Sequence, residues 1–257
     1  MIPSAGTVFR RVGMFLLSLV LAATLWETYK WLGPEQGGEV FGWPIIPKTN
    51  DRVMPHVWEM LAEFGEPEVR GQDTAVWEAM LGYAWYTLRM SIAGLLLGAA
   101  LGFALATLMA RFRVVERGLL PYVIASQTVP LIALAPQVAA IGGNFDLPKW
   151  TWAAGLAAFL SFFPVTVATL RGLQSTPAAP LELMDSYAAG WWTTFRKLRL
   201  PAAMPSIGPG LKLAATASVI GVVVSEVSLG LRGVGFAALT YGQKTTSQPA
   251  TVYTAVF

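Results

Sequence analysis

The residues of this chain that could bind a partner or line a polar pathway lie in two places. The first is residues 182–201, a polar segment between two apolar runs with the sequence ELMDSYAAGWWTTFRKLRLP. Its acidic, aromatic and basic residues follow one another in that order. Aromatic and basic side chains are enriched both at protein interfaces and at the headgroup level of membranes, so the segment fits either a docking surface or a lipid anchor.

The second place is Glu226, an acid at the end of an uncharged apolar run. A charge within a membrane helix is unfavourable and usually faces a pathway or a partner. Alternatively, Glu226 reaches the outer interface and pairs with Arg232. Gln127 and Thr128 are further candidates for a polar pathway, although both could instead satisfy backbone groups freed by Pro130.

Other kinds of chemistry have no matching residues in the sequence. The chain has no cysteine, which excludes disulfides and thiolate metal sites, and its single histidine, His56, has no partner at ligand spacing. It also has no phosphate-binding glycine loop, no HExxH and no nucleophile elbow. We therefore expect no catalytic residue, no metal site and no nucleotide hydrolysis in this chain.

The composition indicates a polytopic membrane protein. Hydrophobic residues make up 54% of the chain and charged residues 13%, and the mean hydropathy is +0.53. The basic residues flank apolar runs, which favours a role in membrane orientation over nucleic-acid binding. The sequence predicts an all-α bundle of about six transmembrane helices, the sixth incomplete at the carboxyl end. The predicted spans are residues 12–26, 91–110, 118–141, 151–170, 213–225 and a segment that begins near Ala250.

The charge distribution predicts the orientation. Arg10 and Arg11 place the amino terminus in the cytoplasm, and the acidic segment 33–82 is expected outside. Within that segment, residues 55–64 have apolar side chains at helical spacing, which predicts an amphipathic helix at the membrane surface. The chain is thus predicted to divide into residues 1–82, with the first helix and external loop, and residues 83–257, the core. The apolar face of the surface helix would comprise Val57, Met60, Leu61 and Phe64.

Two local patterns add detail. Gly94, Gly98 and Gly102 recur at every fourth position, a spacing that lets membrane helices approach closely. In the polar segment, Pro180 suits a first helical position and Glu182 the first turn.

A short helix is expected to run through Tyr187 and to break at residues 189–190. Beyond the break, one face would carry Trp191, Phe195 and Leu198, and another Trp192, Arg196 and Arg199, with Lys197 beside it. Pro201 and Pro205 are expected to end this element and begin the next span.

The spacing of Glu182, Ala188 and Pro201 resembles the signature loop of bacterial ABC importer permeases of the binding-protein-dependent type. That pattern is E-A-A, three residues, G, then a spaced I-x-L-P. Alanine stands at 188 where the family has glycine; since alanine can continue a helix, the bend could lie at Gly190. The resemblance implies a loop, residues 178–200, that couples the permease to an ATPase. The implied coupling residues are Glu182, Leu183, Met184, Asp185, Tyr187, Ala188, Gly190, Trp191, Phe195, Arg196 and Pro201.

The resemblance covers roughly residues 44–257 and is to the taurine, sulfonate, nitrate, thiamine-pyrimidine and riboflavin branch. It implies a type I importer permease for a small organic or anionic solute, with a pyrimidine precursor or riboflavin favoured. Implied partners are a second permease, two ATPase subunits that bind ATP and Mg, an external solute-binding protein and the lipid of the bacterial inner membrane. A membrane-embedded enzyme and a passive channel are the alternatives.

Overall fold

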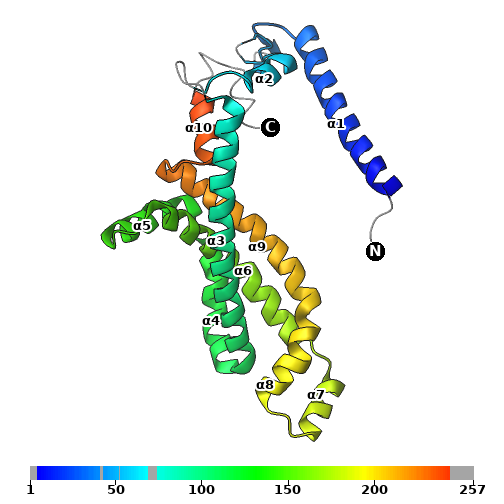
Figure 1. Cartoon of the computed structure of the whole chain (residues 1–257), viewed down its shortest axis with the longest axis vertical. Helices are drawn as coiled ribbons and strands as arrows, with labels where there is room; N and C mark the ends of the chain where they lie inside the picture. Colours follow the sequence, from blue (N-terminus) through cyan, green and yellow to red (C-terminus); the bar gives the residue numbers. More distant parts are fainter. Residues whose placement is uncertain (1–4, 41–42, 52, 69–73, 244–257) are drawn as a thin grey trace. The chain divides into compact units, whose positions relative to one another are not determined.

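The computed structural model describes residues 5–40, 43–51, 53–68 and 74–243 (Figure 1). It separates into two compact units, one of Met1–Leu81 with Ala237–Phe257 and the other of Gly82–Phe236. Two helices, α3 (Val76–Arg111) and α10 (Val234–Gln243), contribute residues to both units. The predicted sixth span and its incomplete end lie outside the described residues.

The first unit begins with α1 (Ala5–Leu32), a membrane-span candidate over Phe9–Leu32. None of the most apolar stretch of α1 is buried, as expected for a helix surrounded by lipid. A two-stranded antiparallel hairpin follows, β1 (Gly38–Val40) with β2 (Trp43–Ile46). This hairpin is an addition to the predicted all-α fold, because strands of three or four residues are too short to show an alternating pattern.

The predicted amphipathic helix is present as α2 (Val57–Glu63), which packs against the end of α1. Its Met60 is buried, whereas Leu61 is 65% exposed, so the expected apolar face is only partly covered. The Glu27 carboxylate holds the start of α2. It accepts from the backbone N–H of Val57 at 2.7 Å and lies 2.8 Å from His56 Nδ1.

A second tie in the same unit joins Lys30 to the segment before α2. The Lys30 ammonium donates to Asp51 Oδ1 and to the carbonyl of Met54, both at 2.6 Å. The nearby ammonium lowers the pKa of Asp51 below its ordinary value. The carboxyl end of α1 and the loop after it are therefore joined by charge-assisted contacts.

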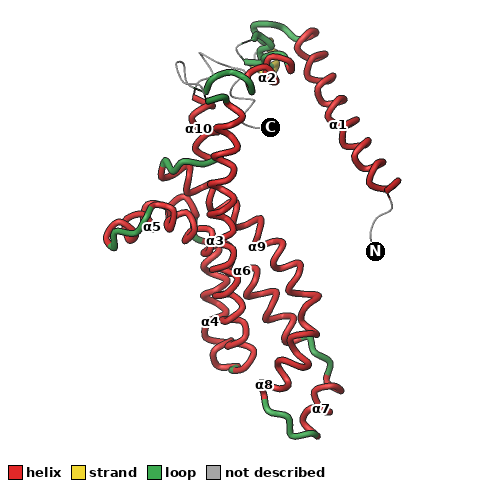
Figure 2. Tube along the Cα trace, in the orientation of Figure 1, coloured by secondary structure: helices red, strands yellow, loops and turns green. Residues whose placement is uncertain are grey.

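The second unit is almost entirely helical (Figure 2). It holds most of α3, α4 (Arg113–Ala125), a 3₁₀ turn (Ser126–Thr128), α5 (Leu131–Asn144) and α6 (Lys149–Gln174). After α6 come α7 (Ala178–Ser186), α8 (Trp191–Thr194), a π-helical turn η2 (Phe195–Arg199), α9 (Leu200–Leu229) and the start of α10.

The central helix of this unit is α6, and small residues allow its neighbours to approach it. A side chain at Gly94, Gly98 or Gly102 of α3 would overlap α6, the first two positions meeting Ala157 and Ser161. The Ser161 hydroxyl also donates to the Gly94 carbonyl at 3.3 Å. Because lipid supplies no hydrophobic drive between helices, this close backbone contact is what holds α3 on α6.

The α6 helix also packs closely on α9, here with glycines on both helices. A Cβ at Gly172 of α6 would lie 2.9 Å from that of Ala203, and one at Gly221 of α9 would lie 2.8 Å from the Cα of Ala157. Ala157 and Ala203 are fully buried. In the α3–α6–α9 core, the backbones therefore approach closely at these glycine and alanine positions.

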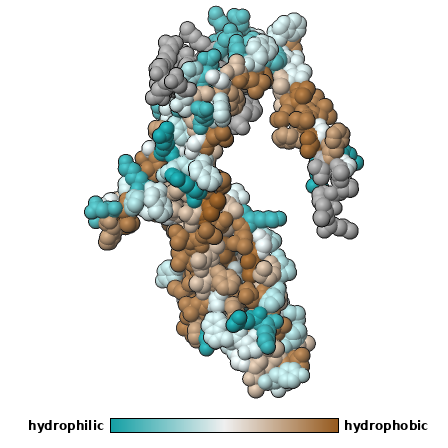
Figure 3. Space-filling view, viewed as in Figure 1, coloured by the Kyte–Doolittle hydropathy of each residue, from teal (hydrophilic) through white to brown (hydrophobic). Residues whose placement is uncertain are grey.

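Four helices are long and apolar enough to span a membrane, and a bent pair of helices could form a fifth span. The described part of the chain thus has four or five span candidates, in accord with a polytopic fold. Apolar surface covers much of the region around α3, α4 and α6 in the space-filling view (Figure 3).

The third predicted span, residues 118–141, is not one straight helix. It is divided between α4 and α5, which meet at an angle of 104°. Val129 is extended and Pro130 caps α5. The residue before a proline is disfavoured in the α region, which accounts for the break at this point.

Candidate docking site

The polar segment begins with α7, an exposed helix. None of its residues is buried, and Leu183 is 56% exposed. The helix begins two residues earlier than predicted, at Ala178 after Pro177. This puts Pro180 third and Glu182 fifth, so Glu182 is not in the first turn. Pro180 is tolerated because the first backbone N–H groups of a helix have no partner within it.

The turn after α7 lies at Ala188, which has a left-handed φ of +50°. The N–H of Ala189 donates to the Met184 carbonyl at 3.0 Å, and the N–H of Ala188 donates to Asp185 at 2.9 Å. These two bonds form a Schellman motif, whose left-handed position favours glycine. The expectation that Ala188 could continue the helix is therefore wrong. Gly190 is extended, with φ −63° and ψ 158°, so it does not form the bend.

The second half of the segment continues into the membrane helix without interruption. Helical structure runs from Trp191 to Leu229, so the prediction that Pro201 and Pro205 end the element is wrong. The turn before Pro201 is a π-helix, in which the Leu200 N–H donates to the Phe195 carbonyl. Pro201 lacks an N–H and lies in the first turn of α9, and the wider turn before it accommodates this loss.

An aromatic cluster fixes this half of the segment to the end of α3. Trp191 stacks on Phe195 at 5.0 Å, and Trp192 meets Phe195 edge-on at 5.7 Å. From α3, Phe103 contacts the Phe195 ring at 6.5 Å, and the Arg111 guanidinium lies 4.8 Å from the Trp191 ring centre. The polar segment, residues 182–201, is thereby packed directly on the transmembrane core, and we call it the docking segment below.

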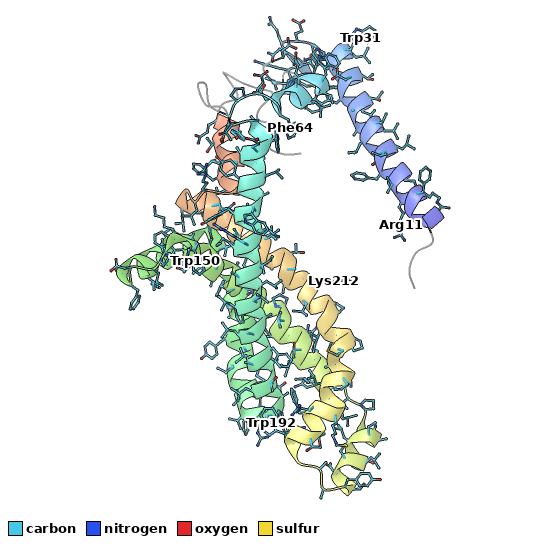
Figure 4. The ribbon with its side chains drawn as sticks, viewed as in Figure 1. Arg11, Trp31, Phe64, Trp150, Trp192 and Lys212 are labelled. Atoms are coloured by element: carbon cyan, nitrogen blue, oxygen red, sulfur yellow. The ribbon has the colours of Figure 1, made fainter. Side chains whose placement is uncertain are left out.

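Within this cluster, some residues are buried and anchor the segment, whereas others are exposed and could contact a partner. Phe195 is only 5% exposed and packs with Leu173 and Ala203, whereas Trp192 is 61% exposed (Figure 4). Phe195 therefore positions the segment from inside. Trp192, which the family pattern did not single out, presents its ring at the surface.

The exposed surface of the segment has an acidic part and a basic part. On α7, Glu182 and Asp185 are exposed, and Tyr187 just after it is 75% exposed. On the π-helical turn, Arg196 and Lys197 are exposed. The segment therefore offers an acidic and aromatic half and a basic half to a partner.

The three residues expected to line a pathway do not share one surface. Gln127 and Thr128 are exposed, and the Thr128 hydroxyl donates to the Ala125 carbonyl at 2.8 Å. The Thr128 hydroxyl is thus bonded within its own turn, to a carbonyl five residues before Pro130. Glu226, in contrast, is fully buried.

Glu226 joins three parts of the second unit. Its carboxylate accepts from the Thr87 hydroxyl of α3 at 2.6 Å and from the Gly235 N–H at 2.8 Å. Thr87 in turn accepts from the Val234 N–H at 3.0 Å. The two side chains therefore satisfy the first two N–H groups of α10. Sequence reasoning missed Thr87, because a lone threonine 139 residues before Glu226 gives no signal.

The suggested pairing of Glu226 with Arg232 is wrong. The Arg232 guanidinium lies over the Tyr83 ring, 5.4 Å from its centre. In the part of the chain that the structure describes, no cationic side chain lies within salt-bridge distance of Glu226. Gly233 leaves room for the carboxylate, since a Cβ there would overlap it.

Several known proteins are similar in sequence to this chain. The family described as "Binding-protein-dependent transport system inner membrane component" matches residues 81–257. A probable ABC transporter permease protein of Haemophilus influenzae is 32% identical over 193 residues, which cover 72% of this chain and 77% of that protein. A formylaminopyrimidine transport permease of Halalkalibacterium halodurans is 37% identical over 150 residues, 58% of each chain.

A third relative widens the range of solutes among these proteins. A putative aliphatic sulfonates transport permease of Bacillus subtilis is 29% identical over 224 residues, 87% of this chain and 71% of that protein. Among solved structures, a crystal structure of an amino acid ABC transporter with histidines matches with a TM-score of 0.57 and 16% identity. That match covers 69% of this chain and 84% of the other, and it shows a shared fold.

Proposed function

The chain belongs to the family of binding-protein-dependent transport system inner membrane components and is an ABC transporter permease, and on that premise we propose that residues 178–200 couple it to an ATPase. The resemblance to the branch that includes pyrimidine and sulfonate permeases is confirmed by the relatives. The observation that carries the proposal is the construction of the segment: an exposed helix, α7, joined by a tight turn to a second helix that is continuous with α9.

This construction suits the transmission of force. Displacement of α7 would reach the core through the Ala188 turn and the Trp191–Phe195 stack. Phe195 packs on Ala203 of α9, so movement of the segment would be carried into a membrane helix. In the proposed cycle, ATP-driven closure of two ATPase subunits draws the segments of two permeases together and opens the pathway outward. Release of ADP reverses the change.

The partners and location follow from the same premise. ATP and Mg would be bound by the ATPase subunits, and this chain would contribute no catalytic group. A second permease, identical or homologous, would complete the pathway, and an external binding protein would deliver the solute. The chain is a multi-pass membrane protein, and its charges favour the bacterial inner membrane with the amino terminus in the cytoplasm.

For the solute, we propose a small organic or anionic molecule. A thiamine-pyrimidine precursor or riboflavin comes first, and taurine, another sulfonate or nitrate next. The similarity to a formylaminopyrimidine permease supports this order, with the sulfonate permease supporting the second class. Measuring which ligand the cognate external binding protein retains would decide between the two.

Co-purification tests the coupling role. Tyr187→Asp changes an exposed residue at the end of α7 and should greatly reduce recovery of the ATPase with the permease. Phe145→Asp is the matched control, since Phe145 is 73% exposed in the connection between α5 and α6 and Tyr187 is 75% exposed. Equal recovery of the ATPase with both variants would show that the segment does not bind it.

A further inference from the structure

An apolar groove runs along α3 toward the docking segment. One part lies between α3 and α6, lined by residues such as Leu97, Leu101 and Phe162. The next part lies between α3 and the aromatic cluster, lined by residues such as Thr107, Arg111 and Trp192. Both parts are lined by Ala104 and Leu108, so the two adjoin at these residues. The groove is therefore apolar along its length and has a cation at one end.

The dimensions of the groove match those of a lipid tail. From Leu97 to Leu108, α3 rises about 17 Å. Half of a membrane hydrocarbon core is about 15 Å thick. No charged residue lies between Arg89 and Arg111, which are about 33 Å apart along the helix. The two arginines therefore mark the two faces of the hydrocarbon layer, and Arg111 lies at headgroup level.

Arg111 has the chemistry to hold a phosphate there. It is exposed, and its guanidinium lies over the rings of Phe112 at 5.2 Å and Trp191 at 4.8 Å. Across the described residues, no carboxylate forms a salt bridge with it. Contacts with ring faces orient a guanidinium while leaving N–H donors at its edge for an anion. The exposed ring of Trp192 lines the groove at the same end.

We propose that this groove binds one anionic phospholipid, with an acyl chain along residues 97–108 of α3 and the phosphate at Arg111. Charge complementarity at the Arg111 end of the groove favours an anionic lipid over a second copy of the chain. A second copy would have to place a carboxylate next to Arg111 at the same depth in the membrane. The bound lipid would lie against the aromatic cluster that fixes the docking segment. The site goes beyond the proposed function. The proposed orientation would place Arg111 in the cytoplasmic leaflet, and only this detail rests on that orientation.

Native mass spectrometry of the full detergent-solubilised chain tests the proposal, using phosphatidylglycerol and phosphatidylcholine with the same acyl chains. The unsubstituted protein should bind one phosphatidylglycerol about fivefold more tightly than phosphatidylcholine, the effect of one well-placed cation. Arg111→Gln should remove this preference. Arg89→Gln, which changes the arginine at the other end of the apolar stretch, should retain it.

A second pair of variants tests the groove independently of charge. Ala104 and Ala100 are both exposed on α3, but only Ala104 lines the groove. Ala104→Phe should reduce binding of both lipids severalfold, and Ala100→Phe should leave both unchanged. Equal binding by these two variants, or an undiminished headgroup preference in Arg111→Gln, would overturn the proposal.

The lack of native cysteine allows a third measurement. Leu101→Cys should form little disulfide between copies in nanodiscs that contain phosphatidylglycerol. Efficient cross-linking would assign the groove to a second copy of the chain and would also overturn the proposal.

Discussion

Thr87 and Glu226 form a buried pair in which the threonine hydroxyl donates to the carboxylate at 2.6 Å while accepting from the Val234 N–H. One hydroxyl thus connects α3, the end of α9 and the start of α10. Thr87 is 6% exposed and Glu226 is fully buried. Buried polar groups are stabilising only when their partners are present, which makes this pair sensitive to substitution.

Replacing Thr87 with valine keeps the shape of the side chain and removes both hydrogen bonds. The Glu226 carboxylate and the Val234 N–H would each lose a partner, so the free energy of unfolding should fall by about 2 kcal/mol. Denaturant titration in detergent measures this change. Thr87→Ser keeps the hydroxyl and should lose much less; equal losses for the two variants would contradict the role of the hydroxyl.

Substitution of Glu226 separates its structural role from a role in transport. Glu226→Gln keeps one acceptor oxygen and should reduce the free energy of unfolding by about 1 kcal/mol, whereas Glu226→Leu removes both acceptors and should reduce it further. Thermal stability and transport should be measured on the same samples. A Glu226→Gln protein with unchanged stability but abolished transport would favour a role in the pathway over a structural role at the start of α10.

Glycine at position 188 should stabilise the docking segment. A left-handed conformation costs an alanine about 1–2 kcal/mol, and the greater freedom of glycine in the unfolded chain offsets part of that gain. The net increase in stability for Ala188→Gly should be about 0.5–1 kcal/mol. Ala189→Gly is the control. Ala189 does not have a positive φ, so this substitution should destabilise the protein. The same sign of change in both variants would argue against the left-handed turn.

A single methyl group should disturb the α3–α6 contact. Gly98→Ala would place a Cβ 2.6 Å from the Ala158 carbonyl oxygen and against Ser161, so stability should fall by about 1–3 kcal/mol. At Gly118 of α4, nothing lies within 4 Å of such an atom. Gly118→Ala should therefore be neutral or slightly stabilising. Comparable melting temperatures for the two variants would mean that α3 and α6 are not closely packed at this point.

The membrane spans and the docking segment could be inferred from sequence because their signals are local. An uncharged run such as residues 91–110 is long enough to cross a bilayer, and its glycines recur on one helical face. The docking segment is recognisable because its polar residues interrupt two apolar runs. Composition and spacing therefore predicted a polytopic helical membrane protein and the place of its candidate docking site, and the resemblance to a known family added the expectation of a permease.

Local geometry was harder to infer where alternatives differ little in energy. Ala188 has good helix propensity, and only the two Schellman hydrogen bonds show that it takes the left-handed position instead of Gly190. Pro201 was expected to end a helix, but a π-helical turn accommodates it and the helix continues. In both cases, hydrogen bonding of the surrounding backbone outweighed the preference of a single residue.

The sequence by itself determined the membrane class, the family and the position of the polar segment, because hydropathy and motif spacing are properties of contiguous residues. Only the tertiary structure decided the environment of Glu226 and the burial of Phe195. Glu226 meets Thr87 and Gly235 from other elements, and Phe195 is enclosed by Phe103 and Ala203. Contacts between residues far apart in the chain depend on how helices pack, and linear spacing carries no record of that packing.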